Sequence, residues 1–404
     1  MVEDRKSRLG RSGLEEKARL YRIADEENKR NKPTSEVLRP FIIKSIEFNT
    51  IPVISSIKYN WPINTTVYNL ESDFIESYLF IDTTNLPSNL KKYLPLWTKV
   101  IFNSKIIIGD SIITYEDYSQ QFQRDLISSN VGMGVDNYFQ RFALINLRVV
   151  MENYHKLSEW TKIALHQISL DVNSILAGGL RLADNARDEK KTRENIAGFL
   201  MKTLLYGKES YNYIFDNIAS HNLHNHIADL EHEQQEVKIL DYLQQIIDFM
   251  STAPKMLKIV GKFDHLEQEY KYGSDWGFLR ENSSIQNQRY DAVTNQTWNN
   301  IGSIRAIINS SQEGAYLIRK SRIIDCGWNS DKTAALMIIA KYLEIESGPL
   351  WENCREAGYC YSVSLTANID AGTLTLELSD CSDLKKTFNA ARQTMNCPTS
   401  RIFH

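Results

Sequence analysis

One stretch near the end of the chain restricts the local fold more than any other. Apolar residues are dense over 334–345, which is typical of a buried helix. Gly348 predicts the end of that helix, and Pro349 fits the first position of a second helix, where no N–H is needed. Gly358 predicts a left-handed residue that turns the chain out of the second helix. Two apolar residues of this second helix are expected to be buried, Leu350 and Trp351.

A β-hairpin is predicted after the second helix. Apolar and polar residues alternate over 361–367, which predicts a strand with one apolar face, and the alternation returns after a turn predicted at 370–372. This order of elements brings Arg355, in the last turn of the second helix, and Tyr361, near the start of the strand, to the same edge of a sheet.

Several of these positions form a sequence signature. Its members are Ser347, Gly348, Pro349, Leu350, Trp351, Arg355, Gly358 and Tyr361. The signature resembles the C-terminal half of pitrilysin-type (inverzincin) zinc metallopeptidases, and in particular the last domain of the presequence-protease-like branch and its cytosolic relatives. The resemblance implies two halves that close around a peptide, each half built of two similar domains. It also implies that zinc and its His-x-x-Glu-His helix lie in the first half, while the second half presents an arginine and a tyrosine, six positions apart, to the substrate.

Arg355 and Tyr361 have that separation, so the resemblance assigns them to substrate binding, as contacts to the transition state. A donor aimed at the oxygen of an attacked peptide carbonyl is typically worth ~3–4 kcal/mol in the barrier. A purely structural explanation is also open: Arg355 favours the helix C-terminus, and Tyr361 is the first core-facing residue of its strand. Tyr359 is a rival for the phenol role, because Cys360-Tyr361-Ser362 departs from the family pattern of a small residue followed by Tyr-Gly.

The expected fold class is α+β, with two metallopeptidase-type domains that each contain an antiparallel sheet packed by helices. Residues 1–40 are expected to form a helical linker between the halves, and 41–266 a domain similar to the family's third. Residues 267–300 read as a polar connector, and 301–404 as a truncated domain similar to the fourth. Because the last domain stops early, its sheet is expected to be incomplete, with an open edge.

Within 41–266 the pattern predicts a strand at 77–82, a helix after Leu86-Pro87, and a hairpin over Asp136-Asn137. Further elements are predicted from the spacing of apolar residues. They are helices over 154–165, 170–185, 190–205 and 223–250, a strand at 259–261 and, in the final domain, a strand at 314–318.

Composition argues against several classes of partner. The 404 residues carry a net charge of −3 and have a pI near 6.3, so neither nucleic acid nor an anionic membrane is expected as a partner. The five cysteines are an odd number without Cys-x-x-Cys spacing, which favours free thiols in a reducing compartment. The N-terminus lacks the apolar segment of a leader peptide, which predicts a cytoplasmic location; a leader in a missing N-terminal half would make the location mitochondrial instead.

One group of histidines and glutamates is a candidate metal site. Its members are His221, His224, His226, Glu231, His232 and Glu233. The inverted zinc motif needs His-x-x-Glu-His, but Ala228 stands where the first histidine should be. His224 and His226 are two positions apart, so they diverge on a helix. The sequence therefore predicts no metal site and no catalytic residue in this chain, and zinc is expected only in the missing N-terminal half.

Three functions remain open from the sequence. The chain is the non-catalytic C-terminal half of a pitrilysin-like metallopeptidase, contributing peptide binding and chamber walls; or a peptide-binding or structural interaction module; or a trans subunit that completes a split metalloendopeptidase. The expected partners are an unstructured peptide and, for the trans subunit, a zinc-bearing N-terminal half. The chain resembles a zinc metalloendopeptidase but is predicted to be inactive on its own.

Overall fold

The computed structural model describes residues 2–30, 53–54, 61–135, 138–229, 233–263, 273, 275–279, 285, 302, 314–323 and 327–396. The chain forms two compact units, Met1–Thr50 and Ile51–His404. The first unit contains helix α1 (Val2–Arg30), which bends at Gly10, where φ is 60°. Its described side chains are almost all exposed, as expected for a charged helix. Among all the described helices, none combines the length and the apolar character needed to cross a membrane.

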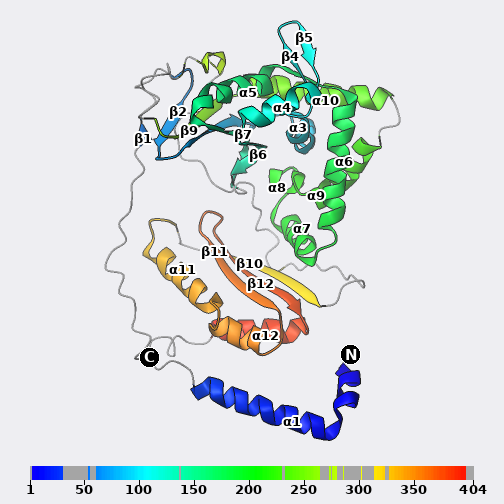
Figure 1. The fold of residues 1–404 in the computed structure, drawn as a ribbon, viewed down its shortest axis with the longest axis vertical. Coiled ribbons are helices and arrows are strands. Elements are labelled where there is room, and N and C mark those ends of the chain that lie inside the picture. Colours follow the sequence, from blue (N-terminus) through cyan, green and yellow to red (C-terminus); the bar gives the residue numbers. More distant parts are fainter. Residues whose placement is uncertain are drawn as a thin grey trace. The chain divides into compact units, whose positions relative to one another are not determined.

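The second unit begins with a six-stranded sheet (Figure 1). Its strands are β1 (Val53–Ile54), β2 (Thr65–Asn69), β3 (Phe74–Asp82), β6 (Ser128–Val135), β7 (Tyr138–Val150) and β9 (Lys255–Gly261). They lie in the order β1-β2-β9-β3-β7-β6, and every neighbouring pair is antiparallel except β2–β9. The sheet is therefore mainly antiparallel, as expected. The parallel pair is possible because a long helical segment separates β2 from β9 along the chain.

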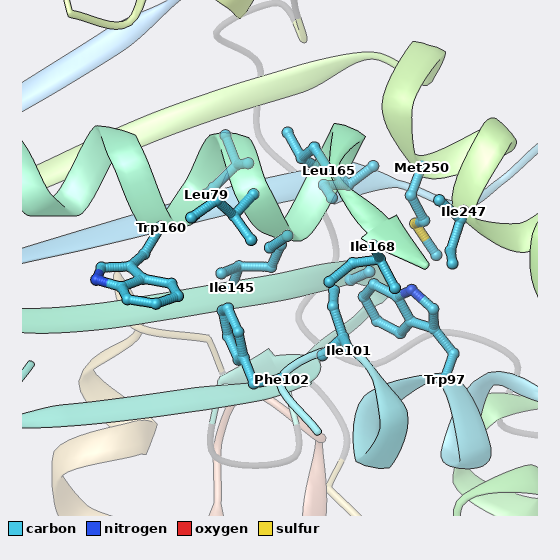
Figure 2. Packing of buried hydrophobic residues seen from close by; sticks show 14 of the residues in the cluster. Leu79, Trp97, Ile101, Phe102, Ile145, Trp160, Leu165, Ile168, Ile247 and Met250 are labelled. Atoms are coloured by element: carbon cyan, nitrogen blue, oxygen red, sulfur yellow. The ribbon is translucent and has the colours of Figure 1, made fainter. Parts of the chain in front are cut away.

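Helices pack on this sheet and close the first hydrophobic core. They are α3 (Leu94–Val100), α4 (Tyr115–Asp125), α5 (Tyr154–His166) and α10 (Glu233–Thr252). In Figure 2, Leu79 and Ile145 of the sheet lie among Trp160 and Leu165 of α5 and Trp97 of α3. All five side chains are at most 2% exposed. Removal of this apolar area from water, at ~25 cal/mol per Å², is the main stabilising contribution of such a core.

A second group of helices consists of α6 (Val172–Glu189), α7 (Arg193–Leu205), α8 (Tyr211–Ile214) and α9 (Asn217–Ala228). One member, α6, packs against α3 and α9. At Gly179 of α6, an added Cβ would lie 2.6 Å from Cγ2 of Ile227 in α9. At Gly178, it would lie 2.9 Å from Cδ1 of Leu96 in α3. Two adjacent glycines therefore allow α6 to approach α3 and α9 more closely than side chains would permit.

The remaining elements of this domain are short. They are helix α2 (Ser88–Lys91), the 3-10 turns Met151–Asn153 and Gly277–Leu279, and a small sheet of β5 (Ser111–Ile113), β4 (Lys105–Ile108) and β8 (Ile168–Ser169). The sequence pattern does not predict β2 or the small sheet. Strands of two to five residues carry too little alternation to be distinguished from loops.

Most elements predicted for this domain are confirmed. The observed counterparts are β3, the hairpin β6–β7, α5, α6, α7 and β9. The turn Asp136-Asn137 lies outside the described residues. The single long helix predicted over 223–250 is wrong, because α9 ends at Ala228 and α10 begins at Glu233. Asp229 has non-helical dihedral angles, with ψ at 35°, and therefore ends α9. The hydrophobic pattern of the sequence continues past this residue, which is why it predicts one helix.

Part of the segment predicted as a polar connector, 267–300, belongs to the first domain. Trp276 and Leu279 are fully buried in its core, and the Trp276 indole N–H donates to the Tyr154 hydroxyl at 3.2 Å. Ile285, 3% exposed, packs in a small neighbouring cluster. The polar composition of this segment conceals these apolar anchors.

The C-terminal part of the chain forms a three-stranded antiparallel sheet with its own core. Its strands are β10 (Ala315–Arg322), β11 (Ser362–Asn368) and β12 (Thr373–Cys381), in the order β10-β12-β11. Helices α11 (Asp331–Glu344) and α12 (Leu384–Asn396) and a π-helix, Trp351–Glu356, pack against it (Figure 1). The helix, strands and turn predicted here are confirmed. Within the described part of the chain, no strand pairs with the outer edge of β10.

Helix α11 is not buried, and this prediction is wrong. Of its apolar residues, Ala340 and Leu343 lie in the core. Leu336 is half-buried, and the others are exposed: Ala334, Ala335, Met337, Ile338, Ile339 and Tyr342. Ile338, for example, is 68% exposed. A high density of apolar residues predicts a helix but does not tell which of its sides another element covers.

Candidate functional site

The bend between α11 and the π-helix depends on a close approach of two backbone segments. α11 ends at Glu344, and Ser347, not Gly348, adopts the left-handed conformation, with φ at 62°. Gly348 is needed for another reason, because an added Cβ would lie 2.7 Å from the carbonyl oxygens of both Tyr342 and Ile345. The glycine therefore lets the chain cross the end of α11, instead of capping the helix as the sequence predicts.

The second helix is wound as a π-helix over Trp351–Glu356. The amide of Ala357 donates to the carbonyl five residues back, at 3.2 Å. Leu350 and Cys354 are fully buried and anchor the helix on the sheet. Gly358 then ends it with the left-handed φ of 76° that the sequence predicts. π-Turns are rare and occur frequently at functional sites, which directs attention to the side chains that this helix presents.

The π-helix and the start of β11 bring one arginine onto two aromatic rings. The Arg355 Cζ lies 3.9 Å from the centroid of the Trp351 ring and 5.0 Å from that of the Tyr361 ring. Such cation–π contacts are worth ~0.5–1 kcal/mol at exposed sites. Arg355 has no ion pair with any residue that the structure describes. We call these three residues, Trp351, Arg355 and Tyr361, the Arg355 stack.

Tyr361 presents its phenol to solvent. Its side chain is 65% exposed, whereas Val363 and Leu365 of the same strand are buried. Its amide donates to the Ser379 carbonyl at 3.0 Å, which fixes its backbone against β12. The explanation of Tyr361 as the first core-facing residue of its strand is therefore wrong. The predicted proximity of Arg355 and Tyr361 is confirmed.

Trp351 is the member of the stack that sequence reasoning misses. It is expected to be buried, but it is only half-buried, and the guanidinium of Arg355 lies over its ring. The spacing of four residues between Trp351 and Arg355 is the signal that could have identified it. The rival tyrosine, Tyr359, is tied down at its backbone: its carbonyl accepts from the Ser382 amide and the Thr387 hydroxyl, both at 3.0 Å.

The described members of the candidate metal cluster do not fit a zinc ion. His224 is 1% exposed, and neither of its ring nitrogens has a hydrogen-bond partner in the described part of the chain. Burial lowers the pKa of His224 to about 4. His221 instead pairs with Asn225, at 3.1 Å, and His226 points to solvent. Glu231 and His232 lie outside the described residues. Within those residues, no group of three or more His, Cys, Asp or Glu side chains could hold a metal ion.

Sequence comparison finds two long relatives. No protein-family model matches the chain. An uncharacterised protein of Caenorhabditis elegans is 24% identical over 401 residues, and one of Schizosaccharomyces pombe is 22% identical over 430 residues. The matches cover 95% and 97% of this chain but 40% and 41% of those proteins. The chain thus spans about two fifths of the length of these relatives.

Several solved structures of similar fold are proteases or a peptidase domain. The peptidase M16 inactive domain from Pseudomonas fluorescens has a TM-score of 0.52 at 11% identity, covering 86% of this chain and 78% of that one. A protease from Helicobacter pylori has 0.55 at 10%, covering 86% and 79%. The periplasmic protease PqqL from Escherichia coli has 0.51 at 14%, covering 92% and 40%. At these identities the similarity shows the fold alone, and the fold is pitrilysin-like.

Proposed function

We propose that this chain is a non-catalytic half of a pitrilysin-like peptidase, in which the Arg355 stack binds an extended, unstructured peptide. The observation that carries the proposal is the Arg355 guanidinium, held 3.9 Å from the Trp351 ring and beside the exposed Tyr361 phenol. The pitrilysin-like fold supports it, since the solved structures of similar fold are proteases and an M16 inactive domain. Membership of the presequence-protease-like branch, or of its cytosolic relatives, is the finer form of this proposal and rests on the signature.

The chemistry of the stack suits the oxygen atoms of a peptide. A guanidinium carries five N–H donors in its plane, and stacking on an indole engages its face and leaves the donors at its edges. The Tyr361 hydroxyl adds another donor. A peptide in extended form offers main-chain carbonyl oxygens at regular intervals, and these accept from such donors without regard to side-chain identity. The proposed recognition is therefore of the peptide main chain.

The proposed role is binding and formation of a chamber wall, with no catalytic residue in this chain. The described His, Cys, Asp and Glu side chains do not fit a zinc ion. We therefore assign the His-x-x-Glu-His helix and its zinc to a separate N-terminal half, the proposed partner. The long relatives support this arrangement, because each has more than half of its length outside the match.

Peptide binding tests this role. Anisotropy of a labelled, unstructured peptide is expected to show saturable binding that Arg355→Ala weakens by roughly tenfold, since a charge-assisted hydrogen bond is worth ~1.5–3 kcal/mol. Tyr361→Phe is expected to cause a smaller loss. The matched control is Arg322→Ala, an exposed arginine on β10 outside the stack, which is expected to bind as the unchanged protein does. Equal affinity of the Arg355→Ala variant and the unchanged protein would contradict the proposal.

A second measurement addresses the trans-subunit form of the same role. Mixed with a separately produced polypeptide that carries the His-x-x-Glu-His helix, the chain is expected to restore peptide cleavage, and Tyr361→Phe is expected to reduce it. The purified chain alone is expected to bind no stoichiometric zinc and to leave the peptide intact. About one zinc per chain, with cleavage that a chelator abolishes, would overturn the non-catalytic assignment.

A further inference from the structure

Two cysteines face each other across the hairpin next to Tyr361 of the Arg355 stack. Cys360 precedes Tyr361 at the entry to β11, and Cys381 ends β12. Two backbone hydrogen bonds flank the pair: the Ser382 amide donates to the Tyr359 carbonyl, and the Tyr361 amide donates to the Ser379 carbonyl, each at 3.0 Å. Continued two residues beyond the Ser362–Ser379 pair, the register of β11 and β12 places Cys360 opposite Cys381.

The strand partner on the other side of β12 is irregular at the same place. Asp380, next to Cys381, takes a positive φ of 50°, and the register of β12 shifts there against β10. Residues opposite one another on antiparallel strands have Cα atoms ~4.5–5.5 Å apart, which lies within the ~4.4–6.8 Å that a disulfide spans. The backbone therefore already holds Cys360 and Cys381 at bridging distance.

The environment distinguishes the two sulfurs. Both thiols are free and buried, at 7% and 1% exposure. A hydrogen bond from the Cys360 thiol to Cys381 raises the pKa of Cys360 and lowers that of Cys381. Cys381 is thus the better nucleophile of the pair, because the thiolate is the reactive form. The third buried thiol, Cys354, has its pKa raised to about 11 by burial, so it stays protonated at neutral pH.

We propose that Cys360 and Cys381 form a reversible cross-strand disulfide when the chain meets a peroxide. The Cys381 sulfur attacks the O–O bond and becomes a sulfenic acid, while the departing oxygen leaves as water. The Cys360 sulfur then displaces the sulfenic hydroxyl, which forms the S–S bond and releases a second water. Two thiols are oxidised by two electrons in total, and one hydrogen peroxide is reduced to two waters. This inference does not depend on the proposed function.

The disulfide would restrain the backbone next to Tyr361 of the Arg355 stack. Cys360 is the residue before Tyr361, and Cys354 lies within the π-helix that carries Trp351 and Arg355. A bridge from Cys360 to Cys381 closes the hairpin covalently and restricts the unfolded chain. We therefore expect the unfolding midpoint of the oxidised protein to rise by about 5 °C.

Oxidation of the full chain with Cys326 and Cys397 replaced by serine tests the inference. Hydrogen peroxide is expected to remove two hydrogen atoms from the intact mass, to give a Cys360–Cys381 cross-linked peptide on digestion, and to be reversed by dithiothreitol. The control Cys354→Ser, in the same background, is expected to behave identically, and Cys360→Ser is expected to lose the cross-link. Thiols that stay reduced in the folded protein, or a cross-link that maps to Cys354, would overturn the inference. If Cys360→Ser folds poorly, peptide mapping of the oxidised protein that retains both Cys360 and Cys381 still shows whether these two residues are cross-linked.

Discussion

Two parts of this chain build the same strand order in different surroundings. β3-β7-β6 and β10-β12-β11 are both antiparallel, and in each the single strand comes first along the chain, followed by helix and hairpin. β3 lies between β9 and β7 and buries Ile75, Leu79 and Ile81, all at most 1% exposed. β10 has one partner strand among those described, and none of its residues is buried.

The comparison shows that the larger hydrophobic core and the candidate site belong to different domains of the chain. The first domain owes its order to many buried side chains around a wide sheet. The Arg355 stack belongs to the smaller domain, where a π-turn, one glycine contact and one backbone hydrogen bond at Tyr361 hold it. Its geometry is set by local interactions, so the two regions are expected to respond differently to substitution.

The largest expected effect is in the core of the first domain. Leu79 faces Ile145 across β3 and β7, and Leu317 faces Leu378 across β10 and β12. Leu79→Ala is expected to lower the free energy of unfolding by about 3–5 kcal/mol, because it leaves a cavity in a closed core. Leu317→Ala, on a half-buried strand, is expected to cost less than half as much. Urea denaturation measures both, and equal losses would break the comparison.

The next effect is a loss of stability in acid that arises in the first domain, at His224 of α9. Burial lowers the pKa of His224 from 6.5 to about 4. Between these pH values the imidazole is protonated in the unfolded chain and neutral in the folded chain. Above pH 6.5 the ring is neutral in both states, so His224 does not lower the free energy of unfolding. As the pH falls from 6.5 toward 4, the free energy of unfolding decreases by up to about 3 kcal/mol. His224→Leu is expected to flatten this part of the pH profile of unfolding, while His226→Leu, at an exposed position, is expected to leave it unchanged. A profile that both variants share with the unchanged protein would rule out this role of His224.

The smallest effect compares a close backbone contact in each domain, at Gly179 in the first and at Gly348 in the second. Gly179→Ala forces a Cβ against Ile227, and Gly348→Ala forces one against two carbonyl oxygens, so each is expected to cost about 1–3 kcal/mol. The matched control is Gly198→Ala, in helix α7, where nothing lies within 4 Å of the added Cβ. That change is expected to stabilise the protein by up to ~1 kcal/mol. Thermal unfolding measures all three, and a harmless Gly348→Ala would show that the crossing at this bend is loose.

Sequence periodicity predicts most of the long elements because their buried faces are regular. The strand and helix patterns of β3, β7, α5 and α6 repeat over many residues, and each is found in the structure. The failures have physical causes. The helix is interrupted between α9 and α10 although the apolar pattern continues. The exposed face of α11 depends on which elements cover the helix, which its own pattern does not tell. Trp276 and Leu279 are isolated anchors in a polar segment, which periodicity does not detect.

The candidate site could be predicted in part. The separation of Arg355 and Tyr361 and the order of helix and strand are enough to bring the two residues together. The contribution of Trp351 is signalled by its spacing of four residues from Arg355, which sequence reasoning does not use. The pairing of Cys360 with Cys381 depends on the hairpin register, which appears only once the strands are aligned.

The edge of β10 that pairs with no described strand has a consequence for concentrated solutions of the protein. Arg319 and Arg322 stand exposed along this strand. Helix α7 contacts the same strand, and two copies approaching along it would bring cations together, which discourages strand-to-strand association. Because ions in the buffer screen that repulsion beyond ~8 Å at physiological strength, dilute buffers are expected to keep the molecules apart better than salty ones.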